Sequence, residues 1–341
     1  MDFTPTEAQA EARDLAARIF ADLATPERLR AAGTGGDPEL WKALCAAGLV
    51  AAVAELGLLG LVLLLEEQGR TTAQVPYAAS CVYGQLAIAA HGTDDQRTRL
   101  LPGIGDGSVV VTGALPAQAA VRPTARPGLS GTVPVVPWLR DATHVLVADT
   151  GRRLWLVPLG EGTGTEEVEL TAPWSAGRLT LDEAPAEILG GEDAYADVLA
   201  TARTAFAGLQ AGVCAGSLAR AVAHTNTREQ FGRPLATRQG VQLRAADAHM
   251  DTEAIRVTAY EAAWRRDAGL PYATHALTAA WWASEAGQRV VHTGQHLHGG
   301  AGADVDHPVH RHFLWGRQLD AYLGSGGEVL QELGELIASG D

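Results

Sequence analysis

Two polar segments of the chain carry the side chains best suited to hold a charged ligand. The first, Thr227 to Gln239, joins two expected helices and contains Arg228, Arg233 and Arg238. Guanidinium groups form paired hydrogen bonds to phosphate, and the start of the following helix adds free backbone N–H groups. The segment therefore indicates a phosphate site. The alternative is a solvated loop between helices, which is the more common role of such a charged segment.

The second segment combines glycines with histidines. Glycines at 299, 300 and 302 allow a ligand or a second backbone to approach closely, as a nucleotide requires. Neutral imidazole is also a common metal ligand, and this part of the chain carries His292, His296, His298, His307, His310 and His312. Their spacing matches no HExxH or Cys/His signature, so we predict hydrogen-bonding or packing roles and no metal site.

Other catalytic signatures are missing from the sequence. It has no GxSxG, GxxxxGK(S/T) or strand-linked GxGxxG motif, which argues against a serine hydrolase, a P-loop nucleotidase and a Rossmann dinucleotide site. Cys45, Cys81 and Cys214 form no CxxC pair or disulfide framework. Because the start also lacks a charged leader before an apolar core, we expect a reducing cytoplasm.

The composition is that of a folded, water-soluble protein. The chain has 341 residues, of which 47% are hydrophobic and 19% are charged, and its formal net charge is −14. It has no uncharged apolar stretch of about 18 residues, the length needed to span a bilayer. Because acidic residues are in excess, the chain would repel nucleic acid and anionic membranes. We expect neither as a partner.

The texture of the sequence changes twice. Ala-rich amphipathic segments run to about Leu101, beginning with a helix that Thr4 caps, with Pro5 first and Glu7 completing a capping box. Short β-branched runs follow; they are Val109–Thr112, Val133–Val136, Val145–Val147, Leu154–Val157 and Val168–Leu170. Helical periodicity then returns. We predict an α+β fold with an N-terminal helical domain (1–107), a small middle β domain (108–192) and a C-terminal four-helix bundle (193–341).

Long helices are expected in the C-terminal part. They run from about Tyr195 to Thr225, through a segment that stops at Gly269, and from Tyr272 to Thr293, with a further helix after Gly327. In the second helix, apolar residues recur at three-, four- and seven-residue steps; they are Leu243, Ala246, Met250, Val257, Tyr260 and Trp264. We predict that this face of the helix is buried.

Five groups of residues along the chain form recognisable motifs. They are Phe3-Thr4 with Gln9, Leu40-Trp41 with Ala47-Gly48-Leu49, Gly92-Thr93-Asp94-Asp95-Gln96 with Leu101-Pro102, Arg228-Glu229-Gln230-Phe231-Gly232 with Gln239, and His298-Gly299-Gly300-Ala301-Gly302. The last two are the more specific. Together the motifs resemble the acyl-CoA dehydrogenase family over nearly the whole chain. The resemblance implies a helical domain, a β domain and a four-helix domain, with FAD bound partly across a subunit interface.

The reaction that the resemblance implies removes two hydrogens next to a thioester carbonyl. A carboxylate takes the α proton while the flavin accepts a hydride from the β carbon. Because that proton is only weakly acidic, the base must be a positioned, water-shielded Asp or Glu. By the resemblance, its two usual positions hold Leu323, before Gly324-Ser325, and Ala202, before Arg203. We therefore predict no catalytic residue in this chain.

The β domain also departs from the family pattern around the flavin ring. Where the family has Thr-Glu-Pro followed by Gly-Ser-Asp, this chain has Thr112 to Ala120 without either carboxylate. The family's Trp-Ile-Thr flavin contact is echoed only by Trp138-Leu139-Arg140, with Arg140 in place of the hydroxyl. The resemblance therefore implies that this chain holds no isoalloxazine ring of its own.

The residues that a family subunit lends to its neighbour's FAD are retained. By the resemblance, the contacts to the pyrophosphate and adenosine half are Arg228, Gln230, Phe231, Leu235, Gln239, His296, which replaces the usual Gln, and Gly300. This implies an FAD shared with a partner in an α2β2 complex, in which a longer homologous subunit supplies the ring pocket and the catalytic Glu. Short subunits of this kind resemble those of actinobacterial dehydrogenases that act on CoA thioesters of steroid side chains. The resemblance also implies an acyl-CoA substrate and an electron-transfer flavoprotein as acceptor.

Two other functions fit the sequence. The chain could be a self-sufficient homo-oligomeric dehydrogenase with a relocated base, for which Glu253 and Glu261 are the nearest candidates in sequence. Both lie on an amphipathic helix, where solvent exposure is the more common role. The chain could also be a non-enzymatic scaffold that binds acyl-CoA or protein, because the base is missing.

Overall fold

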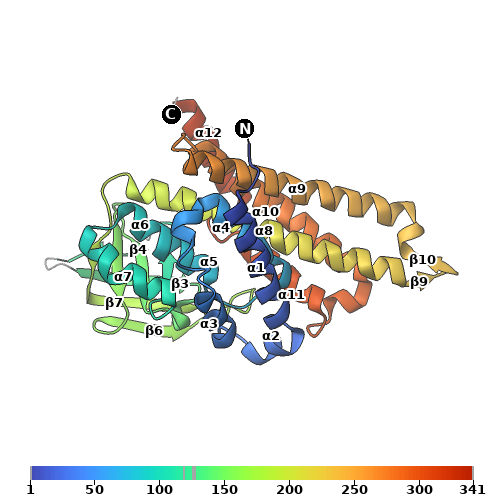
Figure 1. Ribbon diagram of the computed structural model, residues 1–341, viewed down its shortest axis with the longest axis horizontal. Coiled ribbons are helices and arrows are strands. Elements are labelled where there is room, and N and C mark those ends of the chain that lie inside the picture. Colours follow the sequence, from blue (N-terminus) through green and yellow to red (C-terminus); the bar gives the residue numbers. More distant parts are fainter. Residues whose placement is uncertain (1, 118–119, 125–127, 340–341) are drawn as a thin grey trace. The chain divides into compact units, whose positions relative to one another are not determined.

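A computed structural model describes residues 2–117, 120–124 and 128–339 (Figure 1). The chain forms two compact units: the bundle unit, made of Met1–Ala21, Leu58–Ala73 and Arg203–Asp341, and the β unit, made of Asp22–Gly57 and Gln74–Ala202. Along the sequence, helices end at Asp106, strands run from Val111 to Ile188, and long helices resume at Ala194. This succession confirms the predicted α+β order of helical, β and helical parts.

The β unit contains short helices with well-defined starts. They are α2 (Pro26–Ala32), α3 (Pro38–Ala46), α5 (Tyr77–Ala79), α6 (Ala87–His91) and α7 (Asp94–Asp106), with a π-helical segment (Ser80–Leu86) between α5 and α6. The Asp37 carboxylate caps α3 by accepting hydrogen bonds from the N–H groups of Glu39 and Leu40. Thr93 and Gln96 form a capping box on α7.

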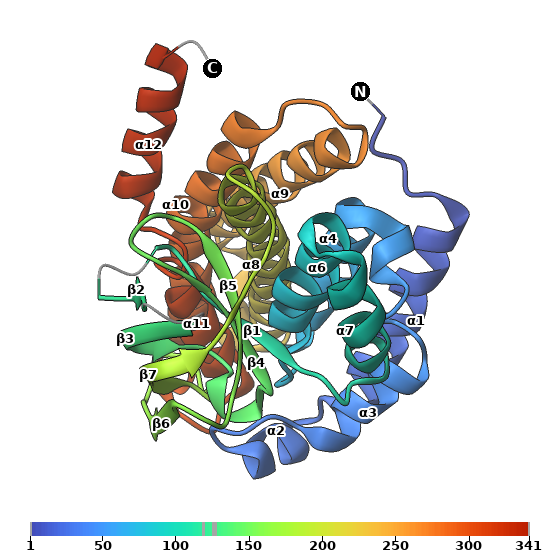
Figure 2. The same cartoon turned by 90° about the vertical axis from the view of Figure 1, so that its left-hand side faces the viewer.

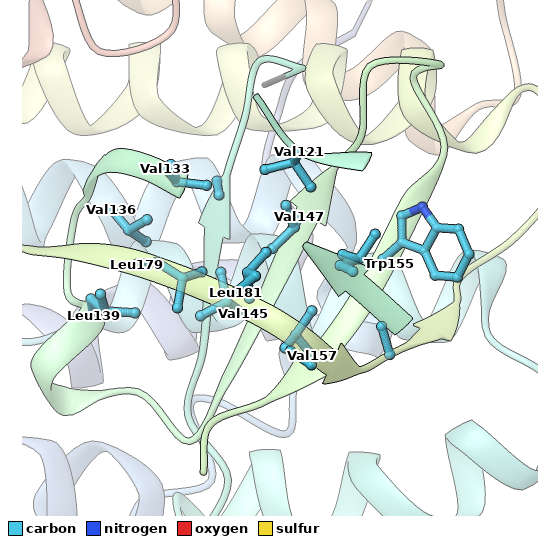
Figure 3. Packing of buried hydrophobic residues seen from close by; sticks show 14 residues of the cluster. Val121, Val133, Val136, Leu139, Val145, Val147, Trp155, Val157, Leu179 and Leu181 are labelled. Atoms are coloured by element: carbon cyan, nitrogen blue, oxygen red, sulfur yellow. The ribbon is translucent and has the colours of Figure 1, made fainter. Parts of the chain in front are cut away.

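Two four-stranded sheets complete the β unit. The first has the order β1 (Val111–Ala114), β4 (His144–Ala148), β5 (Leu154–Pro158), β8 (Glu187–Ile188), with β1 parallel to β4 and the other pairs antiparallel. The second is antiparallel, in the order β2 (Arg122–Pro123), β3 (Gly128–Val136), β7 (Gly177–Pro185), β6 (Thr163–Glu167). Both sheets contribute to one hydrophobic core, shown in Figure 3, which includes Val133, Val145, Trp155, Leu179 and Leu181.

Four of the five predicted β runs overlap strands β1, β3, β4 and β5, but the fifth is wrong. Val168–Leu170 comes after β6, whose residues Thr163–Glu167 are polar and mostly exposed because β6 is an edge strand. β7 was not predicted either, although its residues alternate between buried and exposed. An exposed edge strand has little hydrophobic patterning, so the sequence could not locate β6.

The bundle unit is built mainly from long helices. Its elements are α1 (Glu7–Leu23), α4 (Val53–Thr71) from Leu58 onward, α8 (Ala194–Thr227) from Arg203 onward, α9 (Gln239–Asp267), α10 (Ala273–His298), α11 (Pro308–Leu319) and α12 (Gly326–Ser339). A short hairpin of β9 (Glu229–Gln230) and β10 (Arg233–Pro234) joins α8 to α9, and Figures 1 and 2 show α9 alongside α10. The predicted start of the first helix is wrong by two residues, because Thr6 and Gln9 form its capping box.

α8 is the one helix of the described residues that is long and apolar enough to cross a membrane. However, 72% of its most apolar window is buried inside the protein. That degree of burial is typical of a core helix.

The predicted burial of the apolar face of α9 is wrong for four of its six residues in the single chain, while Tyr260 and Trp264 are half-buried. Leu243, Met250 and Val257 are 56%, 69% and 52% exposed, and Ala246 is exposed as well. Since they recur every seven residues, Leu243, Met250 and Val257 form one line along the helix, which we call the α9 strip. The residues that α9 buries are instead Ala248, Thr252, Ile255, Ala259, Ala262 and Ala263. Periodicity identified an apolar face but not what covers it.

Asp267, at the end of α9, caps another helix of the bundle unit. The helical geometry of α4 is interrupted at Gly57, with φ 73° and ψ −172°, and resumes at Leu58. The Asp267 carboxylate accepts hydrogen bonds from the N–H groups of Leu58 and Leu59 at 2.8 and 2.9 Å, which is the role of an N-cap. We expect Asp267→Ala to lower the free energy of unfolding by about 1–2 kcal/mol, measured by urea denaturation. Asp247→Ala, at an exposed position of the same helix, is the control, and equal losses would contradict the capping role.

Candidate functional site

Two histidines bring the two polar segments of the sequence together in the bundle unit. The rings of His224 on α8 and His298 on α10 are stacked, with centroids 4.6 Å apart and an interplanar angle of 27°. Arg228 follows His224 by one helical turn, and its N–H donates to the His224 carbonyl at 2.8 Å. Gly300 comes two residues after His298. The stacked pair therefore brings together the end of α8, which leads into the first segment, and the end of α10, which leads into the glycines of the second.

A tight hairpin presents the residues between α8 and α9. Its strands β9 and β10 are joined by Phe231 and Gly232, both in the left-handed region with φ of 55° and 75°, as a two-residue type I′ turn requires. Phe231 is 91% exposed, and the Arg238 guanidinium lies 5.1 Å from its ring centroid. Arg238 also donates to the Gln230 carbonyl at 3.1 Å. The fold thus holds an aromatic ring outward at this junction.

The surroundings of the hairpin fit the pyrophosphate and adenosine half of FAD. The predicted contact residues that are exposed, besides Phe231, are Arg228, Gln230, Gln239, His296 and Gly300, while Leu235 is half-buried. Arg228 forms no ion pair with any described residue. α9 begins at Gln239 without a side-chain cap, and a Cβ on Gly300 would meet no atom within 4 Å. A free guanidinium, an uncapped helix start and an open glycine are suited to a phosphate.

The histidines of the second segment pack against other rings and do not point toward a common metal site. Within residues 2–117, 120–124 and 128–339, no group of three or more His, Cys, Asp or Glu side chains could hold a metal ion. His298 contacts the rings of His224 and His307, and His292 contacts the Phe313 ring edge-on at 5.0 Å. These are packing contacts, which is the role predicted for the segment.

The expected base position, Leu323, lies in a nearly filled cavity of the bundle unit. Leu323 is buried, and the cavity that it lines has a volume of about 20 Å³, roughly enough for one water molecule. The rings of Phe206 and Tyr322 meet there edge to face, with centroids 4.7 Å apart. Arg203 also lines it and is bound to Glu332 at 2.7 and 2.8 Å. No described residue that lines the cavity carries a carboxylate.

The two candidates for a relocated base are both held in ion pairs. Glu253 is bound to Arg256 on the next turn of α9. Glu261 lies 3.3 Å from a ring nitrogen of His275 and 3.9 Å from the Arg265 guanidinium. Because each carboxylate is already engaged by a neighbouring side chain of the bundle unit, this geometry does not present either residue as a base aimed at a substrate.

In the β unit, the residues that the resemblance places at the flavin ring are buried or in contact with other residues of the unit. Thr112 is fully buried, and its hydroxyl donates to the Pro137 carbonyl at 2.6 Å. Gly113 belongs to the Thr112–Ala120 segment, in which the resemblance finds no carboxylate, and a Cβ there would lie 2.6 Å from the Tyr83 ring. Ala202, the other expected base position, is fully buried. Residues 118–119 of the predicted Thr112–Ala120 segment lie outside the described residues.

The partial match to the family's Trp-Ile-Thr is also engaged in internal contacts. Trp138 is buried and stacked on Trp174, with centroids 5.8 Å apart and an interplanar angle of 25°. Arg140 donates to the Thr34 carbonyl at 2.7 Å and pairs with Glu167 at 3.1 Å. Both side chains therefore stabilise the β unit itself.

Comparisons with known proteins show the family of the chain. The family models for the acyl-CoA dehydrogenase N-terminal and C-terminal domains match residues 6–108 and 190–333. The chain belongs to the acyl-CoA dehydrogenase family. This confirms the predicted resemblance and fold class, and it makes the protein an oxidoreductase of that family.

This acyl-CoA dehydrogenase has similar relatives over its whole length. It is 34% identical to acyl-CoA dehydrogenase FadE27 of Mycobacterium tuberculosis over 99% of both chains. It is also similar to a chain of a variant of the Tcur3481-Tcur3483 steroid ACAD, with 44% identity, a TM-score of 0.92 and coverage of 98% of both chains. A chain of the ChsE4-ChsE5 complex from Mycobacterium tuberculosis gives 32% identity and a TM-score of 0.93 over 99% of both chains.

Proposed function

We propose that this chain is the subunit of a heteromeric acyl-CoA dehydrogenase that lends residues to an FAD and supplies neither the ring pocket nor the catalytic base. The observation that carries the proposal is a contrast. Arg228 and Phe231 are exposed, whereas the expected base positions, Leu323 and Ala202, are buried, and Gly113 of the flavin-ring segment lies against Tyr83. A chain that has contacts for the FAD tail but no ring pocket and no base can contribute to catalysis only beside a subunit that supplies both.

Each exposed residue has a defined task in this proposal. Arg228 neutralises the pyrophosphate, and the N–H groups that open α9 at Gln239 add hydrogen bonds. Phe231 offers the adenosine half an apolar face, and Gly300 leaves room for close approach. FAD, when bound, accepts the hydride that leaves the β carbon of the acyl-CoA. A longer homologous subunit supplies the ring pocket and the catalytic Glu.

The α9 strip supports a protein partner at this edge. A line of large exposed apolar side chains indicates an interaction surface. A groove of about 990 Å³ between α9 and α10 is lined by Met250 of the strip and by His296. His296 belongs to the cofactor edge, by which we mean the predicted FAD contacts around the hairpin and Gly300. One partner can therefore cover both the strip and this edge. The ChsE4-ChsE5 complex and the Tcur3481-Tcur3483 protein support a two-protein assembly, for which we propose α2β2.

The substrate proposed for the complex is a steroid side-chain acyl-CoA, into which it introduces an α,β double bond. The support is the similarity to the Tcur3481-Tcur3483 steroid ACAD. We propose electron-transfer flavoprotein as the acceptor, from the family resemblance. The cytoplasm is the proposed location, which is consistent with the burial of α8.

The test compares the chain alone with the chain co-expressed beside a longer homologous subunit. Alone, it should be colourless and inactive, because it lacks a ring pocket and a base. The co-purified complex should be yellow, with one FAD per pair of unlike chains by absorbance and native mass spectrometry, and should oxidise acyl-CoA. A yellow, active single protein would overturn the proposal in favour of a self-sufficient enzyme. A flavin-free, inactive complex would favour a scaffold.

A further inference from the structure

Three histidines from different parts of the bundle unit form a continuous stack beside the proposed cofactor edge. The buried His298 lies between His224 of α8 and His307, which caps α11. The His224 and His298 rings are stacked with centroids 4.6 Å apart, and the His298 and His307 rings meet edge to face at 4.8 Å, with an interplanar angle of 64°. We call these three residues the histidine stack. It adjoins the edge through Arg228, one turn after His224, and Gly300, two residues after His298.

The hydrogen bonds of the stack define where a proton can be added. His298 Nδ1 lies 2.7 Å from the Gly294 carbonyl; because a carbonyl only accepts, Nδ1 carries the hydrogen and Nε2 is open. His307 Nδ1 accepts from the Val309 N–H at 3.2 Å, so protonating that atom would break a helix cap. The His224 ring makes no hydrogen bond to any described residue. His224 and His298 are therefore the available proton sites.

The charges around the stack are mostly positive. Element by element, the flanking charged or titratable groups are Arg220 on α8, Arg228 directly after α8, His296 on α10, Asp304 before α11, and His310 and Arg311 on α11. Arg220, His224 and Arg228 recur every four residues, so they share one face of α8. Neither Arg220 nor Arg228 forms an ion pair with a described residue. Asp304 acts against these positive groups at His307, and Glu229 and Asp306 are the acids next in sequence to Arg228 and His307.

This environment disfavours charge on the unliganded stack. Burial, the neighbouring His298 ring and Arg228 lower the pKa of His224. Burial, the rings of His298 and His224, and Arg220 lower the pKa of His307, against the opposing effect of Asp304. A positive charge on His224 or His307 is therefore disfavoured in the absence of an anion.

We propose that a phosphate group held at Arg228 draws a proton onto His224 or His298, so that this chain grips the FAD tail more tightly as the pH falls. The inference rests on the proposed function, because it assigns the phosphate to that cofactor. His224 and His298 are positioning residues in this view. They hold the Arg228 end of α8 against the Gly299-Gly300 turn and provide the proton site.

The sign follows from electrostatic linkage. A nearby anion stabilises charged imidazole, so the bound phosphate raises the histidine pKa relative to the free protein. At a pH between the free and bound pKa values, binding takes up a proton, and affinity increases as the pH falls. Because the pKa of free His224 lies below the usual imidazole value of about 6.5, the window opens below that pH and extends upward by the size of the rise. The FAD pyrophosphate keeps its charge over this range. A rise of about one unit in one imidazole pKa gives up to about tenfold tighter binding.

The experiment measures FAD dissociation from the two-chain complex at about pH 6, 7 and 8 by flavin fluorescence. His224→Phe keeps an aromatic ring in the stack but cannot take a proton. His298→Asn keeps an N–H donor for the Gly294 carbonyl and cannot be charged in this range. The double variant removes both proton sites. His249→Phe, at an exposed histidine of α9, is the matched control.

The wild-type complex and His249→Phe should bind FAD about threefold to tenfold more tightly at pH 6 than at pH 8. The double variant should lose most of this slope. His298→Leu, which lacks the donor, should weaken binding at every pH more than His298→Asn does. Calorimetry of wild-type FAD binding in two buffers of different ionisation enthalpy should show proton uptake, and it needs no variant.

Two failures can be told apart. If Arg228→Glu abolishes FAD binding but the wild-type affinity is flat with pH and no proton is taken up, the histidine proposal is wrong and the proposed function stands. A slope that survives in the double variant would also overturn the histidine proposal. If Arg228→Glu has no effect on FAD at any pH, the proposed function itself fails.

Discussion

Arg228→Glu is expected to empty the FAD site of the two-chain complex. Arg228 is exposed, lies one turn beyond His224 and forms no ion pair with a described residue, so its charge is available to a phosphate. A hydrogen bond to a charged group contributes about 1.5–3 kcal/mol, and the new carboxylate adds repulsion. FAD affinity should therefore fall by about 100-fold or more. Flavin released on gel filtration and the FAD dissociation constant measure the loss.

Arg18→Glu provides the matched control for this charge reversal. Arg18 is an exposed arginine of α1 that forms no ion pair with a described residue, and it lies on no predicted cofactor contact. The change in net charge is the same, so FAD affinity should stay within about twofold. Loss of FAD in both variants would indicate a nonspecific charge effect, and retention in both would contradict the assignment of Arg228.

Gly113→Ala is expected to destabilise the β unit strongly. The added Cβ would lie 2.6 Å from three carbons of the Tyr83 ring, and Tyr83 is fully buried, so neither side can yield without repacking the core. Overpacking of this kind costs about 1–3 kcal/mol, and we expect a value near the top of this range by urea denaturation. A larger side chain, such as that of glutamate, would be accommodated less well still.

A strand glycine in an open environment tests whether the effect is steric. At Gly164 on β6, a Cβ would meet only Thr180 at 3.7 Å, which is ordinary contact, so Gly164→Ala should change stability by less than about 0.5 kcal/mol. In a Tyr83→Leu background the cost of Gly113→Ala should shrink, which a double-mutant cycle measures. Equal costs at the two glycines would show that the Tyr83 ring does not exclude a side chain.

Local patterns predicted much of the fold because they act over few residues. Helical periodicity and stop signals placed α8, α9 and α10, and β-branched runs placed β1, β3, β4 and β5. The predictions failed where local signals were ambiguous. Thr4 with Glu7 and Thr6 with Gln9 both fit a capping box, and only the backbone path selected the second pair.

In the candidate site, too, the sequence predicted the residues that belong to motifs and missed those that do not. The sequence shows three of its features directly: the spacing of Arg228 to Gln239, the glycines that follow His298, and the absence of a carboxylate at positions 202 and 323. Tyr83 and His224 were missed because neither belongs to a motif. The spacing of Arg220, His224 and Arg228 on one helix face was the available signal for His224.

The sequence by itself determined the family, the order of the elements and which chemical groups the chain has and lacks, since these depend on residue identity and short-range periodicity. Tertiary structure decided what those groups face. Whether a glycine leaves open space depends on residues that are distant in sequence. At Gly113 the space is filled by the ring of Tyr83. Whether the apolar face of α9 is covered depends on which surfaces fold against it, and the exposed α9 strip shows that its own chain does not cover it.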